Sequence, residues 1–132
     1  MKCYIAGRIG EDDDKEKRIA LFNYAEDLLR EGGYEPVNPT RLCISRWKWL
    51  YRLVGYRLTL LYDLWLLMHC DCVYKIPGWW TSRGANIESC TSYHFRIYPL
   101  SAQYRELLDS LIAARAKDLG LTIEERPIRR RL

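Results

Sequence analysis

The chain has 132 residues, of which 48% are hydrophobic and 29% are charged, as is usual for one soluble globular domain with a buried core. Its net charge of +4 equals the four arginines among its last seven residues, so the rest of the chain is neutral and lacks the overall basic character of a nucleic-acid-binding protein. We expect one domain over residues 1–120 and a basic C-terminal tail over residues 121–132.

The cysteine count and the hydropathy pattern bear on the cell compartment. Five cysteines is an odd number, and no charged-then-apolar leader opens the sequence. The most apolar stretch, residues 58–70, is interrupted by Asp63 and is shorter than the roughly 20 residues that a membrane-spanning helix needs. We therefore expect a reduced, cytoplasmic protein without a membrane partner.

The first forty residues fit a β-turn-α-β unit. Residues 2–6 are β-prone, the glycines at 7 and 10 predict a turn, and apolar residues recur at helical spacing from about residue 13 to residue 31. Gly32-Gly33 predicts the end of that helix, and residues 34–37 predict a second strand. Such a unit usually begins a parallel doubly wound sheet.

The remainder continues the alternation of helices and strands. Residues 41–55 are ambiguous, with tryptophan and leucine spacing that suggests a helix. The elements that we expect after them are a helix over 56–69, a strand over 71–76, a loop over 79–84, a helix over 85–94, a strand over 95–98, a helix over 101–119 and a possible short strand over 121–124. The fold class is therefore α/β: a single-domain doubly wound (flavodoxin/Rossmann-like) sheet of four to five mainly parallel strands flanked by helices.

Three unusual segments, residues 7–10, 38–40 and 77–84, follow predicted strands. In open parallel sheets, ligands bind beyond the carboxyl ends of the strands, so these segments are expected at the ligand edge. The backbone amides of Gly7 and Gly10 could approach an anion, with Arg8 as a fork-shaped donor. Two glycines are a weak signal, however, and the acidic residues at 11–14 would repel a phosphate unless they turn away.

Three side chains could carry chemistry, and each has a simpler interpretation. Glu88 is expected in the first turn of its helix, where the helix dipole would stabilise the anion that a glycosyl nucleophile needs, although it could instead be a capping partner for Ser82. Asp63 interrupts an apolar helix and is either solvent-exposed or polar-ligand-binding. Tyr4 shares one strand face with Ala6, opposite Cys3 and Ile5, and could be a core residue.

The loop and the cysteines leave further alternatives. Trp79 and Trp80 could stack on a nucleobase, a sugar or a partner subunit. Cys70 and Cys72, beside His69, could suggest zinc; on one strand their thiols would share a face, but no second ligand pair follows. We interpret both cysteines as small buried hydrophobic residues, regard His94 as a surface residue, and expect no metal and no cofactor.

In order and spacing, several short motifs together resemble the nucleoside 2-deoxyribosyltransferase superfamily over roughly residues 2–100. These motifs are Tyr4-Ile5-Ala6-Gly7-Arg8-Ile9-Gly10, Asn38-Pro39, Asp63-Leu64, Cys70-Asp71 and the stretch from Gly78 to Glu88. Ser82, Gly84 and Glu88 also match the Ser-x-Gly-x-x-x-Glu spacing of the related deoxynucleoside 5′-monophosphate N-glycosidases. The chain also resembles an uncharacterised phage and bacterial branch of the superfamily.

The resemblance implies roles for these residues. Glu88 would attack the anomeric carbon to give a covalent glycosyl enzyme, Asp63 would orient or protonate the leaving group, and Tyr4 would position the nucleophile. The substrate-binding residues implied by the matching segments are Gly7, Arg8, Gly10, Asn38, Trp79, Trp80, Ser82 and Gly84. The transferases commonly carry an extra aspartate shortly before the nucleophile, and residues 79–87 hold no acid, which favours hydrolysis over base exchange.

Three functions follow as hypotheses. The first is N-glycosidic bond cleavage or transfer on a nucleoside or nucleotide by a homo-oligomer, as members of the superfamily often assemble. The second is a non-catalytic protein that binds a nucleotide or modified base in the same pocket. The third, which we do not favour, is nucleic-acid binding through the Arg tail and the basic residues Arg46, Lys48, Arg52 and Arg57.

Overall fold

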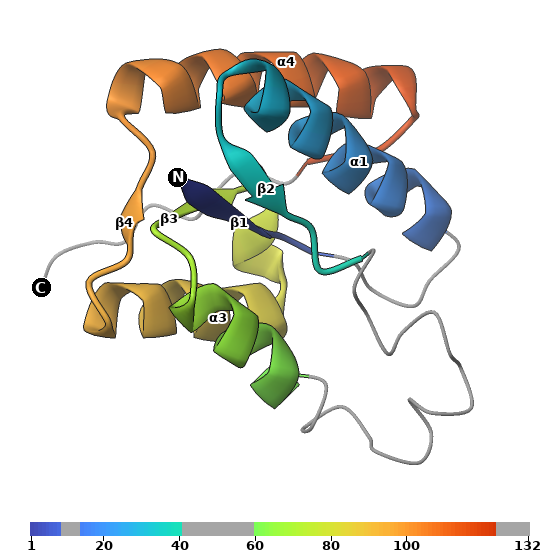
Figure 1. Ribbon diagram of the computed structural model, residues 1–132. Coiled ribbons are helices and arrows are strands. Elements are labelled where there is room, and N and C mark those ends of the chain that lie inside the picture. Colours follow the sequence, from blue (N-terminus) through green and yellow to red (C-terminus); the bar gives the residue numbers. More distant parts are fainter. Residues whose placement is uncertain (9–13, 41–59, 124–132) are drawn as a thin grey trace, which may run out of the picture.

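The computed structural model describes residues 1–8, 14–40 and 60–123 (Figure 1). Its elements in chain order are β1 (Lys2–Ala6), α1 (Lys15–Glu31), β2 (Glu35–Val37), a helical stretch over residues 60–68, β3 (Cys72–Lys75), the 3₁₀ helix η2 (Trp79–Thr81), α3 (Arg83–His94), β4 (Tyr98–Pro99) and α4 (Ala102–Asp118). The four strands are all parallel and lie in the order β2-β1-β3-β4. The predicted α/β doubly wound class is therefore confirmed.

The strand order indicates where in the sheet a ligand site is expected. The chain leaves β1 toward β2 and later returns to the other side of β1 to add β3, so the direction of winding changes between β1 and β3. In such sheets the crevice at this switch point is the usual ligand site. The residues that follow β1 and β3 there are Gly7, Arg8 and the segment 76–82.

Two apolar layers hold the sheet, one on each face. Cys3 and Ile5 pack with α1 and α4, whereas Tyr4 and Ala6 pack with Leu67 and with residues near β3. Figure 1 shows α1 and α4 over one face of the sheet and α3 with residues 60–68 over the other. The predicted division of alternate β1 residues between the two faces is confirmed, and both faces are buried because β1 is a central parallel strand.

Several predicted boundaries differ from the structure. α3 begins two residues earlier than predicted, and the strand predicted over 95–98 begins only at Tyr98. The delay has a backbone cause: the Phe95 N–H bonds to the Thr91 carbonyl and the Ile97 N–H bonds to the Ser92 carbonyl, with Arg96 at a φ of 57°. These bonds complete the end of the helix before extended backbone can start.

The end of the described chain packs on the body of the domain. Residues 121–123 form no strand, because the Leu121 N–H bonds to the Ala116 carbonyl and the chain folds back at the end of α4. Leu121 and Ile123 lie against the apolar layer that contains α1 and α4. Some predictions fall on residues that the structure does not describe. They are those for residues 41–55, for most of the Arg tail, and for Arg46, Lys48, Arg52 and Arg57.

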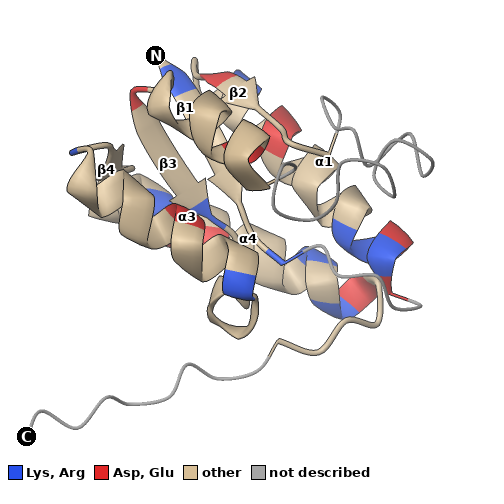
Figure 2. Cartoon of the chain, turned by 90° about the horizontal axis from the view of Figure 1, so that it is seen from below, with Lys and Arg blue, Asp and Glu red and all other residues tan. Residues whose placement is uncertain are grey.

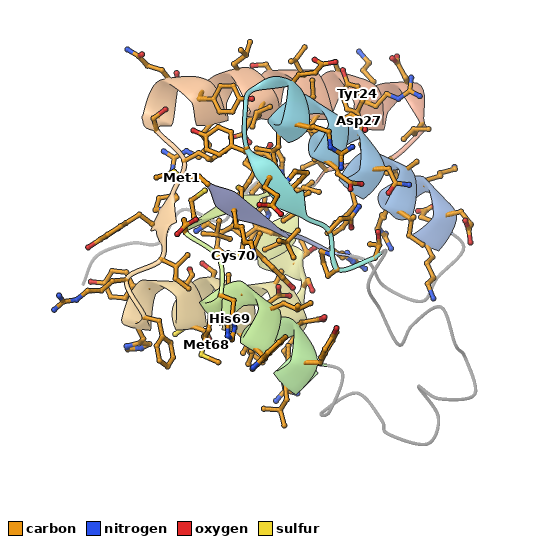
Figure 3. All side chains as sticks on the ribbon, in the orientation of Figure 1. Met1, Tyr24, Asp27, Met68, His69 and Cys70 are labelled. Carbon is orange, nitrogen blue, oxygen red and sulfur yellow. The ribbon has the colours of Figure 1, made fainter. Side chains whose placement is uncertain are left out.

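The prediction that Cys70 and Cys72 share a face is wrong. β3 starts only at Cys72, so Cys70 precedes the strand. Cys72 packs with Cys3 in the layer below α1 and α4, whereas Cys70 packs with Tyr4 on the opposite face. Figure 3 shows Cys70 close to the sheet and Met68 and His69 farther out, in the layer of α3.

Candidate functional site

Residue Ser82 sets the start of α3. Its side-chain oxygen accepts a hydrogen bond from the Ala85 backbone N–H at 3.3 Å, which satisfies one of the free donors of the first turn. The Asn86 amide donates to the Ser82 carbonyl at 2.7 Å and to the Trp80 carbonyl at 3.0 Å, and this ties the helix to the preceding loop. Gly78 allows that loop to turn, because its φ is 96°.

With this start, Glu88 is the sixth residue of α3 and lies in the second turn. The expectation of a first-turn position is therefore wrong. The capping alternative is also wrong, because a capping partner of Ser82 would be the third residue of the helix, and that residue is Ala85. Ala85, Glu88 and Ser92 are the buried residues of α3. Their spacing places them on one side of the helix, the side that faces the sheet.

The pKa of the Glu88 carboxyl group is affected by both of the other predicted catalytic residues. Burial is the largest effect on its pKa and raises it; the Tyr4 side chain lowers it, and the nearby Asp63 charge raises it, to about 8 in total. Tyr4 is fully buried on β1, and Asp63 is half-buried within residues 60–68. The atom Glu88 Oε2 is also buried, and no described residue forms a hydrogen bond to it.

This environment reverses the expected charge of Glu88. The helix dipole acts mainly within the first turn, whereas loss of water penalises a carboxylate wherever it is buried. A carboxyl with a pKa of about 8 holds its proton at pH 7. A buried carboxyl beside a phenol and a second carboxylate is an arrangement suited to proton transfer or to nucleophilic attack once the proton leaves.

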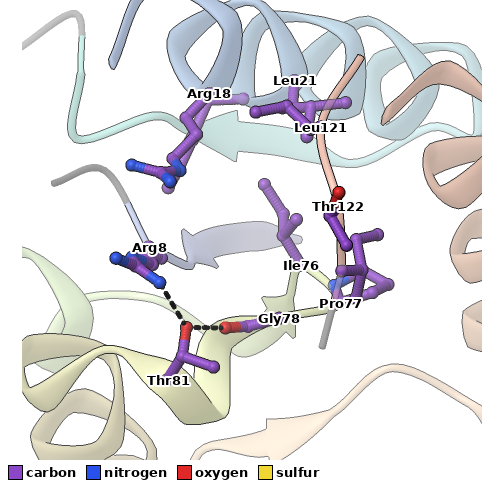
Figure 4. Close-up of a pocket in the computed structure, with 11 residues that line it drawn as sticks. Arg8, Arg18, Leu21, Ile76, Pro77, Gly78, Thr81, Leu121 and Thr122 are labelled. Atoms are coloured by element: carbon purple, nitrogen blue, oxygen red, sulfur yellow. Dashed lines mark hydrogen bonds between the residues drawn. The ribbon is translucent and has the colours of Figure 1, made fainter. Parts of the chain in front are cut away.

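The first loop contributes a small cavity beside the switch point. It has a volume of about 70 Å³ and is lined by residues that include Arg8, Arg18 and Thr81. Arg8 donates to the Thr81 hydroxyl at 3.2 Å, and Figure 4 shows the Arg8 and Arg18 guanidinium groups on the same side of the cavity. Their positive charge would suit an anion of phosphate size, but this cavity lies on the α1 side of the sheet, away from Glu88.

Gly7 and Gly10 are the two glycines predicted to bind a ligand in this loop. A Cβ on Gly7 would lie 3.1 Å from the Phe22 ring and 3.2 Å from Ile76 Cβ, so close packing with the core favours glycine there. Gly10 lies outside the described residues.

Residue Asn38 is engaged within the protein. Its amide nitrogen donates to Asn23 at 3.1 Å and to Glu26 at 3.3 Å. Its oxygen accepts from the Thr40 backbone at 3.0 Å and from the Thr40 hydroxyl at 2.6 Å. Two donor hydrogens and two acceptor positions are all that an asparagine side chain has. In this conformation Asn38 joins the turn after β2 to α1 and offers a ligand no further hydrogen bond.

The remaining predicted binding residues surround the start of α3. Trp79 and Trp80 are half-buried and meet edge to face, with ring centroids 6.1 Å apart. Gly84 lies in the first turn of the helix after the Ser82 cap. The loop from Trp79 to Gly84 is therefore built as one unit with the helix that carries Glu88.

Among the described residues, no three His, Cys, Asp or Glu side chains gather closely enough to hold a metal ion. Nδ1 of His69 lies 2.7 Å from the Trp65 carbonyl in its own helical segment, and His94 is exposed at the end of α3. Figure 2 shows Lys and Arg residues interspersed with Asp and Glu residues over the described elements.

One polar pair was not identified from the sequence. Lys75, the last residue of β3, donates to the Ser89 hydroxyl at 3.1 Å and places its ammonium 4.6 Å from the centre of the Trp79 ring. Both residues line a groove of about 910 Å³ between α3 and β4. The sequence did hold a signal for this pair, because Lys75 is a lysine in an otherwise apolar strand. A strand that is buried on both faces leaves its side chains little contact with solvent, so a lysine there is unusual.

Comparison with known proteins identifies a family and no activity. A family model described as "Domain of unknown function (DUF4406)" matches residues 1–97, which include Tyr4, Asp63 and Glu88. No curated protein and no solved structure matches the chain significantly. Within the described residues, no helix is both long enough and apolar enough to cross a membrane.

The raised pKa of Glu88 predicts a pH-dependent gain in stability for Glu88→Gln. A carboxyl with a folded-state pKa of about 8 and an ordinary value of 4.5 binds its proton more tightly when folded, so the wild-type protein loses stability as pH rises from about 4.5 to about 8. Relative to wild type, Glu88→Gln should gain up to about 5 kcal/mol across this range. Urea unfolding at pH 5 and pH 8.5 measures the gain.

The exposed residue Glu16 provides a control for the loss of one negative charge. Glu16→Gln should change stability by a similar amount at both pH values. A Glu88→Gln gain that does not grow with pH would contradict the burial of a proton on Glu88.

Proposed function

This chain belongs to the DUF4406 family, whose description names no activity, and we propose from the geometry around Glu88 that it cleaves the N-glycosidic bond of a (deoxy)nucleoside or nucleotide. The observation that carries the proposal is the buried Glu88 carboxyl, whose pKa is affected by both the Tyr4 side chain and the Asp63 charge. Two carboxyl groups acting on one glycosidic bond can divide nucleophilic attack from proton transfer. The resemblance to the nucleoside 2-deoxyribosyltransferase superfamily supports the same assignment.

The proposed reaction has two steps. The ionised Glu88 carboxylate attacks the anomeric carbon, the C–N bond breaks, and the base leaves with the bonding electrons, oriented by Asp63, and takes a proton from water. A water molecule then attacks the anomeric carbon of the glycosyl ester and passes a proton through the Asp63 carboxylate to solvent, which restores both carboxylates. Tyr4 holds the Glu88 carboxylate by donating a hydrogen bond.

Hydrolysis is favoured over transfer to a second base. The loop over residues 79–87 carries no acid, whereas the transferases that the chain resembles commonly have one there. Ser82 accepts a hydrogen bond from Ala85, and its own O–H remains a possible donor to a 5′-phosphate.

The pKa of Glu88 favours a second candidate function. With a proton at pH 7, Glu88 cannot attack, and the same pocket could bind a nucleotide or modified base without turnover. The protonated carboxyl would then donate a hydrogen bond to the ligand. In that case binding is saturable and no base is released.

The proposal predicts release of free base from deoxynucleosides or their monophosphates, measured by chromatography over a substrate panel. Glu88→Ala should lower kcat by about 10³-fold or more, because the nucleophile is lost. Ser89→Ala, one residue along α3, is the matched control and should retain most of the activity. Equal turnover by Glu88→Ala would contradict the mechanism, and binding without base release by wild type would favour the second function.

The pH dependence of kcat/KM distinguishes the roles of the two carboxyls. If ionised Glu88 is the nucleophile, kcat/KM should rise with an apparent pKa of about 8. Tyr4→Phe removes the hydroxyl that lowers this pKa and should shift the profile to higher pH. Asp63→Asn removes a charge that raises it and should shift the profile to lower pH while reducing the rate.

A fall in kcat/KM through pH 8 would contradict this assignment. It would make Glu88 the proton donor and Asp63 the nucleophile.

We further propose that the protein functions as a homo-oligomer. Leu61, Trp65 and Met68 are exposed at helical spacing within residues 60–68, the segment that carries Asp63. Trp65→Glu should reduce the molecular mass measured by light scattering to that of the monomer and should lower activity. Leu107→Glu, at an exposed position on α4, is the control and should leave the mass unchanged. A wild-type monomer at working concentration would contradict the proposal.

A further inference from the structure

The groove between α3 and β4 does not include Glu88, Tyr4 or Asp63 in its lining. Its volume is about 910 Å³, within the range of small-molecule sites. From α3 it is lined by Asn86, Ser89, Cys90, Ser92, Tyr93 and His94, whereas Ala85 and Glu88 are not among the lining residues. None of the described residues that line the groove is acidic.

Two cations give the groove its charge. Lys75 is held in place, because its ammonium bonds to Ser89 at 3.1 Å and lies 4.6 Å from the centre of the Trp79 ring. Arg96 is exposed at the other end of α3, just beyond the last turn. With no acid among the lining residues, this charge is complementary to an anionic ligand.

Arg96 also occupies a backbone position that usually belongs to glycine. Its φ is 57°, and it is the sole residue other than glycine with a positive φ in the described part of the chain. A left-handed residue just after a helix is most often glycine, because a side chain there is strained. Such a local conflict at the edge of a groove is a sign of a functional side chain.

Aromatic rings line the same groove. Tyr93 and Tyr98 are 83% and 67% exposed, and the Trp79 ring lies at the Lys75 end. Positive charge interleaved with accessible rings is the combination that binds single-stranded nucleic acid, where rings stack on bases and cations contact phosphates.

We propose that this groove binds the base and phosphate of a nucleotide, free or as part of a single strand, with Lys75 and Arg96 contacting phosphate and Trp79 and Tyr98 stacking on the base. The site differs from the Glu88 pocket and does not rest on the proposed glycosidase activity.

The test is calorimetric titration of the full-length Glu88→Gln protein, which cannot turn over substrate by the proposed mechanism, with thymidine, thymidine 5′-monophosphate and a ten-nucleotide thymidine strand. The monophosphate should bind at least ten-fold more tightly than thymidine. Lys75→Met and Tyr98→Ala should each weaken phosphate-ligand binding about five-fold or more. Lys117→Met, which removes an exposed cation on α4, and Tyr4→Phe in the Glu88 pocket should leave binding unchanged.

The two sources of the ligand give different results. A strand that binds far more tightly than the monophosphate, with affinity that falls steeply with salt, identifies single-stranded nucleic acid. Similar affinities identify the free nucleotide. Binding that is insensitive to Lys75→Met and Tyr98→Ala, or that is lost with Tyr4→Phe, would overturn the groove assignment and leave the base-release assay unaffected.

Arg96→Gly separates ligand binding from a purely structural role. Glycine relieves the left-handed backbone, so the melting temperature should stay the same or rise by a few degrees while binding weakens several-fold. A lower melting temperature together with unchanged binding would overturn the role of Arg96.

Discussion

The hydrogen bond between the Ser82 side chain and the Ala85 backbone determines where α3 begins, and the position of that start decides the direction of every later side chain in the helix. A start one residue earlier or later would rotate the helix by about 100° relative to its sequence. Glu88 would then leave the sheet, and Ser89 would leave Lys75. The Asn86 side chain donates two further hydrogen bonds, to the Trp80 and Ser82 carbonyls of the preceding loop. These bonds hold the helix start at the same residue.

The Glu88 environment is set by competition between burial and local polar contacts. The Tyr4 side chain favours the anion, but loss of water and the Asp63 charge oppose it and dominate. The result is a carboxyl that changes charge close to physiological pH. A ligand that brings positive charge near Glu88, as an oxocarbenium-like sugar does, would favour ionisation at the point where the proposed chemistry needs it.

Much of the fold could be predicted because its signals are local. The alternation of β1 residues assigned Tyr4 to one face, and the apolar spacing of α1 follows from a helix packed on one side. The charge of Glu88 could not be predicted, because it depends on the extent of burial and on Asp63, which approaches only in the folded chain. The same applies to Asn38, whose partners Asn23 and Glu26 are on α1.

Two locally unfavourable features occur on or beside α3: a buried carboxyl at Glu88 and a left-handed arginine at Arg96. A sequence optimised only for stability would place an apolar residue at the first position and glycine at the second. Neither feature is needed to form α3, because Ser82 caps its start and backbone bonds from Phe95 and Ile97 close its end. The two unfavourable side chains face different spaces, the sheet and the groove. Residues that conflict with their local structure in this way mark the places where function, rather than folding, has determined the sequence.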